Sequence, residues 1–211
     1  MKLPTDFEVS FAAFLQETMH ADLAHDLSHV LRVVSNAKQL TLQENADLWI
    51  VLPAAYLHDC FSYPKNHSQS HQSSQLAGDK AIQFLASIQY PSHTYKAIYH
   101  AIAAHSYSAN ITPTSIEAKI VQDADRLDAL GAIGIARCIQ VGSSFDAQLY
   151  SLDDPFADKR LLDDHKYTVD HFFNKLFKLP ESMQTKAGKK EAHKRMIFMR
   201  QYLNQLRQEI I

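Results

Sequence analysis

The chain is poor in the residues that make tight turns, with only 5 glycines and 7 prolines among its 211 residues. An all-β fold needs frequent turns, so this scarcity argues against one. Cysteine is scarcer still, with Cys60 and Cys138 alone. Two cysteines are too few for a disulfide framework or a structural zinc ribbon. A catalytic thiol at Cys60 is conceivable, but a small buried apolar residue is the simpler interpretation.

The chain also lacks an excess of charge and a long apolar run. Its formal net charge of −2 gives no general attraction to nucleic acid or acidic lipid. No charged-then-apolar leader opens the sequence, and no apolar stretch reaches the length of a membrane span. We therefore expect a soluble cytoplasmic protein without a membrane partner. The basic stretch 186–195 lacks interleaved aromatic residues, so we interpret it as a solvated helix face rather than a specific nucleic-acid site.

What the chain does have is helical periodicity and enough apolar residues, 46%, for a core. With no repeats and no linker, this pattern predicts an all-α fold, a single-domain helical bundle over 1–211 with a metal-site core at about 20–135 and C-terminal helices at about 165–210. Capping boxes are expected at Thr5–Glu8 and Thr114–Glu117, and Pro53 is expected to kink or restart its helix. The other expected helices are 26–40, 45–58, 74–88, 91–105, 114–130, 132–141, 166–179 and 189–209, with a polar loop at 60–72 and an irregular segment at 142–164.

Four short segments carry the side chains that can do chemistry: 25–33, 57–59, 100–105 and 123–128. Histidine and aspartate on separate helices can enclose a divalent cation, and such a cation activates water. The first three candidate ligands are His29, His58 and Asp59. Asp59 follows a wholly apolar helix, where an unpaired carboxylate would cost several kcal/mol in order of magnitude. The fourth is Asp125 or Asp123, between which spacing alone does not decide. These residues favour a hydrolase.

The pattern of His29, His58–Asp59 and Asp125 resembles the H…HD…D motif of the HD superfamily of metal-dependent phosphohydrolases. The stretches 24–33, 63–67, 122–137 and 183–185 resemble one bacterial subfamily in particular, some members of which are linked to manganese-dependent nucleoside triphosphate pyrophosphohydrolase activity. In that family's pattern the last aspartate follows alanine and precedes a basic residue, which implies Asp125 rather than Asp123. The implied cofactor is a divalent metal ion, manganese first, with Mg, Fe, Zn, Co or Ni as alternatives.

The resemblance implies that activated water attacks phosphorus while cations of the protein hold the phosphate chain. The candidates are Arg32, Lys65 and Arg126, although Arg126 could instead pair with Asp123. Lys65 lies in the 60–72 loop, which we expect to act as a mobile lid. The expected partner is a small-molecule phosphate, a nucleotide first, and the expected reaction converts a nucleoside triphosphate to monophosphate and pyrophosphate. A phosphodiesterase or phosphomonoesterase of the same fold, or a non-catalytic metal- or nucleotide-binding regulatory protein, is the alternative, and a homodimer is compatible with the sequence.

Further polar residues near these segments have open roles. His100 and His105 are candidate catalytic residues. They are five apart, about 140° around a regular helix, so both can face one site only if the helix ends between them. Asp128 shares a helix face with Asp125 and is a third catalytic candidate. His25 and Asp26 are candidates for fixing the orientation of a ligand ring.

Overall fold

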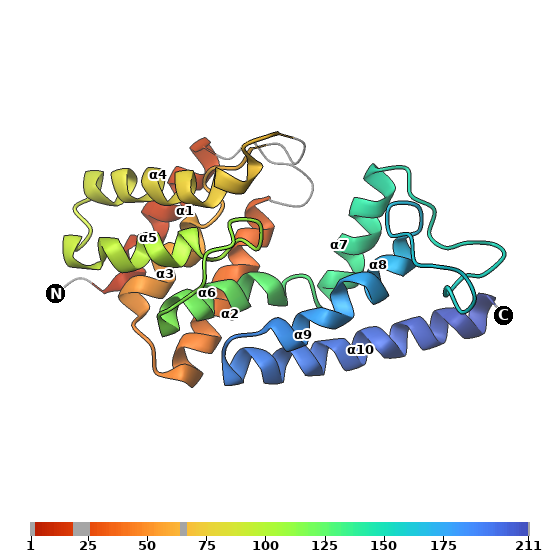
Figure 1. The fold of residues 1–211 in the computed structure, drawn as a ribbon. Helices are drawn as coiled ribbons and strands as arrows, with labels where there is room; N and C mark the ends of the chain where they lie inside the picture. The colour runs from red at the N-terminus through yellow and green to blue at the C-terminus, as the bar shows by residue number, and fades with distance from the viewer. Residues whose placement is uncertain (1–2, 19–25, 64–66, 211) are drawn as a thin grey trace. The chain divides into compact units, whose positions relative to one another are not determined.

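The computed structural model describes residues 3–18, 26–63 and 67–210. These residues form α-helices and short 3-10 helices and no strand, so the fold is all-α as predicted (Figure 1). Their contacts group them into two compact units, one within 1–125 plus Gln184–Gly188 and the other within 126–183 plus 189–211. The single domain over 1–211 therefore stays a prediction. Among the described residues, no helix combines the length and apolar character needed to cross a bilayer.

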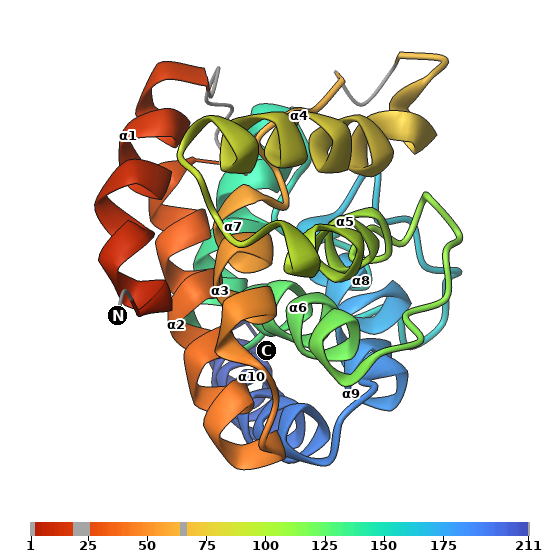
Figure 2. The same cartoon turned by 90° about the vertical axis from the view of Figure 1, so that its left-hand side faces the viewer.

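The first unit is built around α3, Leu48–Leu57, whose residues 51–57 are all buried. Helix α3 packs against α2, α5 and α1, and Figure 2 shows it enclosed by these neighbours. The helix runs through Pro53 without restarting. The other helices of this unit are α1 (Glu8–Thr18), α2 (Leu27–Glu44), α4 (Ser73–Ser87), α5 (Tyr95–Ala103) and the part of α6 (Ile116–Leu127) that ends at Asp125. Because His58 and Asp59 directly follow α3, the central helix carries them into the interior.

Aspartate side chains cap the N-terminal ends of α2 and α3. The Asp26 carboxylate accepts the backbone N–H of His29 at 2.8 Å and so caps α2. The Asp47 carboxylate caps α3 in the same way by accepting the N–H of Trp49 at 2.8 Å. Side-chain oxygens at these positions satisfy backbone donors that have no partner within the helix.

Both predicted capping boxes are wrong in detail. At the N-terminal end Asp6, not Thr5, provides the cap, accepting the Leu3 N–H at 2.7 Å, while Glu8 accepts hydrogen bonds from Tyr56 and Lys38 at 2.7 Å. At α6 the hydroxyl oxygen of Ser115, one residue after the predicted cap, accepts the Ala118 N–H at 3.1 Å. In both cases a side-chain oxygen beside the predicted threonine accepts the backbone hydrogen bond instead.

The second unit contains α7 (Gly131–Ser144), α8 (Thr168–Asn174), α9 (Leu179–Ser182) and most of α10 (Lys186–Ile210). The predicted continuous helix 166–179 is wrong, because α8 ends at Asn174 and a 3-10 turn, Leu176–Lys178, leads into α9. Pro180 lies in the first turn of α9, where proline favours a helix start. The irregular segment before α8 is held by Arg160, which donates two hydrogen bonds to the fully buried Asp170, one of them at 2.7 Å.

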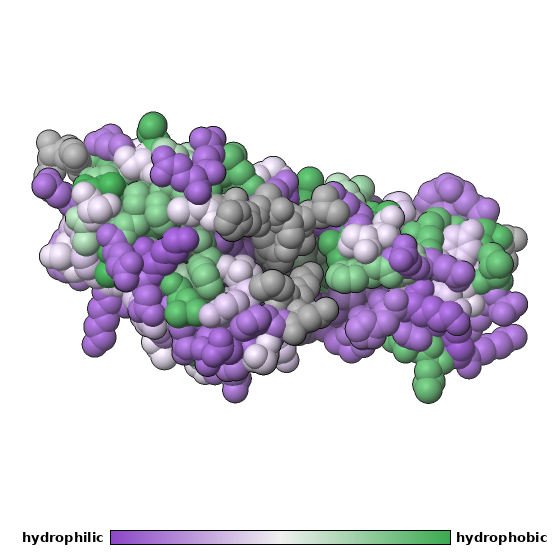
Figure 3. Space-filling view, turned by 90° about the horizontal axis from the view of Figure 1, so that it is seen from above, coloured by the Kyte–Doolittle hydropathy of each residue, from purple (hydrophilic) through white to green (hydrophobic). Residues whose placement is uncertain are grey.

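Hydrophilic and hydrophobic residues are interspersed on the face drawn in Figure 3. Several large apolar side chains of the second unit are exposed, among them Leu152 at 88% and Leu161 at 91%. Leu152 and Leu161 lie in the irregular segment between α7 and α8. Scattered apolar side chains of this kind are usual on protein surfaces.

Candidate metal centre

Five side chains from four segments of the first unit converge on one place. They come from α2, from the turn after α3, from the segment after α5 and from α6. Two groups that could hold a metal ion share His58, and in each group the ligand atoms lie within 4.8 Å of one another. The first group is His29, His58 and Asp125, and the second is His58, Asp59 and His105.

The carboxylates lie between the imidazole rings. Asp59 presents Oδ2 to His58 Nε2 at 3.4 Å and Oδ1 to His105 Nε2 at 3.5 Å. On the other side, Asp125 Oδ1 lies 3.5 Å from His29 Nε2. Two ligand atoms bound about 2.1 Å from a tetrahedral metal lie about 3.4 Å apart. The observed separations therefore suit atoms that share a cation better than direct hydrogen bonds.

The backbone sets which ring nitrogen faces the group. His58 Nδ1 donates to the carbonyl of Ala55 at 2.9 Å, and His105 Nδ1 donates to the carbonyl of Ile102 at 2.6 Å. A carbonyl can only accept, so each neutral ring carries its proton on Nδ1 and offers the lone pair of Nε2. His58 Nε2 is buried and, within the described part of the chain, has no hydrogen-bond partner. A buried acceptor in this state is costly, and a divalent cation would satisfy it.

The electrostatic surroundings differ between the two rings. Burial lowers the pKa of His58 below its ordinary value, which keeps the ring neutral as a metal ligand requires. Burial is also the largest influence on His105 and acts in the same direction. The nearby carboxylates of Asp59 and Asp125 favour the protonated ring, outweigh burial and raise the pKa of His105.

The thiol next to the group is inert. Cys60 is buried, and burial raises the pKa of its thiol to about 12. A protonated thiol is a poor nucleophile. The structure thus supports the interpretation of Cys60 as a small buried residue.

Asp123 and Asp125 lie in different surroundings. Both oxygens of Asp123, which is fully buried, are used within the protein: they accept the backbone N–H groups of Gln184 and Thr185 at 2.8 Å and the Thr185 hydroxyl at 2.7 Å. A side chain at Gly188 would place its Cβ 2.4 Å from the Asp123 carboxylate, so only glycine leaves room there. Asp125, with 31% of its side chain exposed, lies beside His29 instead.

His100 and His105 lie in different surroundings, because α5 ends at Ala103, between them. His105 follows the helix end and joins Asp59. His100 remains on the helix, where its Nε2 accepts the N–H of Thr114 at 3.1 Å. It belongs to neither group of ligand atoms. A catalytic role for His100 stays a prediction.

The remaining predicted residues make other contacts. Asp26 caps the helix of His29, as described above, and so fixes the backbone of that residue. Arg32 is half-buried and donates from Nη1 to the Ser28 hydroxyl at 2.9 Å. In the second unit, Arg126 Nη1 donates to the carbonyl of Ser182 at 2.5 Å, and Asp128 forms an ion pair with Arg137 at 2.7 Å. His25 and Lys65 lie outside the described residues, so their predicted roles are untested.

A cavity of about 360 Å³ adjoins the convergent side chains and contains Asp59, His105 and Asp125 in its lining. Every other described lining residue carries a hydroxyl group: Ser62, Tyr63, Ser70, Ser73, Ser74, Ser106, Tyr107 and Ser108. The sequence interpretation did not single out these residues. The available signal was the run of hydroxyl residues that follows each ligand segment, after Asp59 and after His105.

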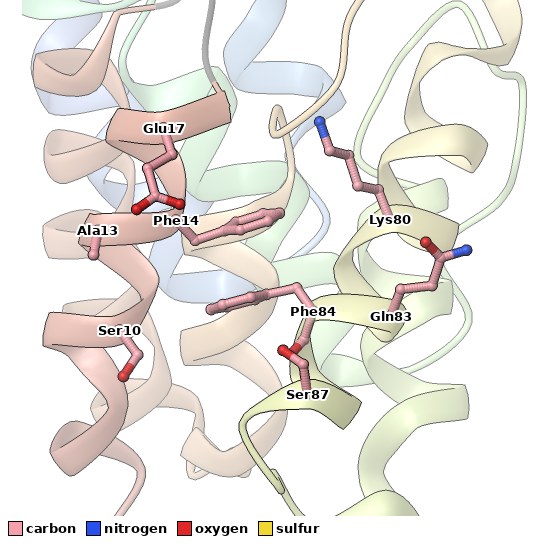
Figure 4. Close-up of a pocket in the computed structure, with 8 residues that line it drawn as sticks. All are labelled: Ser10, Ala13, Phe14, Glu17, Lys80, Gln83, Phe84 and Ser87. Carbon is pink, nitrogen blue, oxygen red and sulfur yellow. The ribbon is translucent and has the colours of Figure 1, made fainter.

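A second, wider hollow of about 580 Å³ lies between α1 and α4. Figure 4 shows Phe14 of α1 and Phe84 of α4 lying over one another across it, with ring centroids 4.0 Å apart. Among the described residues of its lining Glu17 alone is acidic, and none of the five convergent side chains reaches it. Its described residues form no group that could hold a metal ion, so the cavity beside Asp59 is the candidate site for chemistry.

The chain is similar in sequence and in fold to several known proteins. A family model described as "HD domain" matches residues 26–130. The uncharacterized protein YpgQ of Bacillus subtilis is 32% identical over 190 residues, which cover 88% of this chain and 84% of YpgQ. A crystal structure of B. subtilis YpgQ in complex with ADP matches with a TM-score of 0.74 and 30% identity, covering 98% of this chain and 96% of that one. An HD-superfamily hydrolase from Bacillus thuringiensis matches with a TM-score of 0.75 and 33% identity, covering 98% of both chains.

Proposed function

The chain belongs to the HD-domain family and has the fold of an HD-superfamily hydrolase, and from that premise we propose that it is a metal-dependent phosphohydrolase that cleaves nucleoside triphosphates to monophosphate and pyrophosphate. The observation that carries this proposal is the convergence of three histidines and two aspartates beside a cavity. Both the nucleotide and the choice of manganese as the cation go beyond that observation. The nucleotide is supported by the ADP complex of the YpgQ structure, and manganese by the resemblance to the pyrophosphohydrolase subfamily.

The proposed ligands are His29, His58, Asp59 and Asp125, with His105 placed to add a fifth. A divalent cation held there supplies Lewis-acid chemistry, which makes water a nucleophile at neutral pH and neutralises phosphoryl oxygens. The protein's own contribution is positioning. The carbonyls of Ala55 and Ile102 fix two rings by accepting their Nδ1 protons, so that both Nε2 atoms face Asp59.

Asp59 is central to this arrangement because each of its oxygens faces a different ring. Its side chain is only 16% exposed, and a carboxylate oxygen carries two lone pairs, so one oxygen can accept from both a cation and a proton of water. His105 Nε2, at 3.5 Å from Asp59, can complete the ligand set or hold a proton for the leaving oxygen. Arg32, Lys65 and Arg126 remain the proposed cations for the phosphate chain.

A product-identification panel tests the function. Metal-free protein is loaded with Mn²⁺ and given nucleoside triphosphates, a phosphodiester and a phosphomonoester, and the products are separated by anion exchange. We expect nucleoside monophosphate and pyrophosphate from the triphosphates, and loss of turnover in Asp59→Ala and Asp125→Ala. Nucleoside diphosphate and orthophosphate as products would show that the enzyme cleaves a different phosphoanhydride bond from the one proposed. If every compound remained intact, the enzyme proposal would be wrong and a binding role would replace it.

A further inference from the structure

The segment that leaves α5 places an aromatic ring at the cavity. Ser106, Tyr107 and Ser108 directly follow His105 in the connection between α5 and α6, which loops out beside the helices in Figure 2. All three residues line the cavity that contains Asp59, His105 and Asp125. Tyr107 is 90% exposed. A single exposed aromatic residue needs no explanation by itself, but this one borders the candidate centre.

Of the two tyrosine rings in the described lining, Tyr107 is the one that is free of ring stacking and can receive a ligand. The other one, Tyr63, is stacked on His67 with ring centroids 4.3 Å apart and an interplanar angle of 5°. Phe61 packs edge-on to Tyr63 at 5.0 Å. Tyr107 makes no ring contact with any described residue. Its face can therefore receive a flat group without first breaking a stack.

The rest of the described lining suits a neutral polyhydroxylated group. Serine hydroxyls can each donate and accept, as sugar hydroxyls also do. Ser106 and Ser108, the residues before and after Tyr107 in the chain, already show this complementarity, since their hydroxyl oxygens lie 3.0 Å apart. Apart from the three convergent residues, the described lining holds no charged side chain. Hydroxyls beside an exposed ring match a sugar joined to a base better than they match a bare phosphate chain.

We propose that Tyr107 stacks on the base of the nucleotide and that the serine hydroxyls of the cavity bind its sugar, a proposal that rests on the nucleotide substrate proposed above. Stacking on an aromatic face tolerates any base, because every base presents a π-surface. The substrate class is thus nucleotides in general, with weak preference among bases. Phosphate compounds that lack a base would not use Tyr107.

The first test is equilibrium binding, which needs no turnover. Fluorescent 1,N6-ethenoadenosine diphosphate is titrated with wild-type protein, Tyr107→Ala, Tyr107→Phe and the control Leu42→Ala, in the presence of Mn²⁺. Leu42 is 84% exposed on α2 and does not line the cavity. We expect Tyr107→Ala to weaken binding about tenfold, and Tyr107→Phe, which keeps the ring, to stay within about twofold of wild type. Equal affinities for wild type and Tyr107→Ala would overturn the proposal.

The second test separates this proposal from the proposed function. The ratio of kcat/KM for ATP to kcat/KM for inorganic tripolyphosphate is measured for the same variants. We expect the ratio to fall about tenfold in Tyr107→Ala, through KM rather than kcat. If wild type cleaves ATP and the ratio does not change, Tyr107 has no stacking role although the function stands. If wild type cleaves neither compound, the function fails, and the fluorescence titration alone decides on Tyr107.

Discussion

Asp123 and Asp125 are separated by one residue of α6 and meet opposite environments. The first is fully buried and accepts three hydrogen bonds from Gln184 and Thr185, so its charge is satisfied by the protein alone. The second is partly exposed and lies 3.5 Å from a histidine nitrogen. A carboxylate of the first kind stabilises the fold, whereas one of the second kind is suited to a cation.

Asp123→Asn should therefore lower stability, and Asp125→Asn should not. The amide at position 123 can no longer accept all three hydrogen bonds, and hydrogen bonds to a charged group contribute about 1.5–3 kcal/mol each. We expect Asp123→Asn to lose about 3 kcal/mol of unfolding free energy in urea denaturation of metal-free protein. Asp125→Asn, the matched control, should stay within about 0.5 kcal/mol of wild type. Equal losses in the two variants would contradict these separate roles.

The sequence could identify the candidate ligands because their types are distinctive, but it could not place every neighbour. Spacing left Asp123 and Asp125 undecided, since the partners of Asp123 lie about sixty residues away in the chain. Which of His100 and His105 faces the candidate centre depended on where α5 ends. The helix stops at Ala103 although no glycine or proline marks the position. The hydroxyl residues of the cavity could not be predicted with them, because serine is common in loops and a run of hydroxyl residues does not by itself indicate a site.

At the scale of elements, the site depends on helix ends more than on helix interiors. His29 lies in the first turn of α2, His58 and Asp59 follow the last turn of α3, and His105 follows α5. The existence of these helices could be predicted from apolar periodicity. Their caps could not, because several oxygen-bearing side chains compete at each start: Asp6 takes the place expected of Thr5, and Ser115 that of Thr114.

The cap of α2 provides a test at this scale. Asp26 accepts the N–H of His29, so Asp26→Ala should cost about 1 kcal/mol of unfolding free energy and loosen the turn that carries His29. Asn caps nearly as well as Asp, so Asp26→Asn should retain most of that stability. Thermal and urea unfolding of both variants measure this. If Asn were as damaging as Ala, the charge of Asp26 rather than its cap would be what matters.

At the scale of the whole molecule, the candidate centre joins segments that are far apart in the chain but belong to one compact unit. Its side chains span positions 29 to 125, and the HD-domain match covers the same stretch, 26–130. Apolar burial brings the helices together, while the buried His58 Nε2 at the end of α3 finds no hydrogen-bond partner among the described residues. Binding of a cation to the folded state alone would stabilise the unit by mass action.

The most direct measurement is of Mn²⁺ binding itself. Free Mn²⁺ gives an electron paramagnetic resonance signal that diminishes when the ion is bound, so metal-free protein can be titrated without any substrate. We predict that wild-type protein removes at least one equivalent of free Mn²⁺ at micromolar concentrations and that Asp125→Asn, verified as folded by circular dichroism, binds at least tenfold more weakly. If wild type left the free signal unchanged, or if Asp125→Asn bound Mn²⁺ as tightly as wild type, the convergent histidines and aspartates would not be the metal centre described.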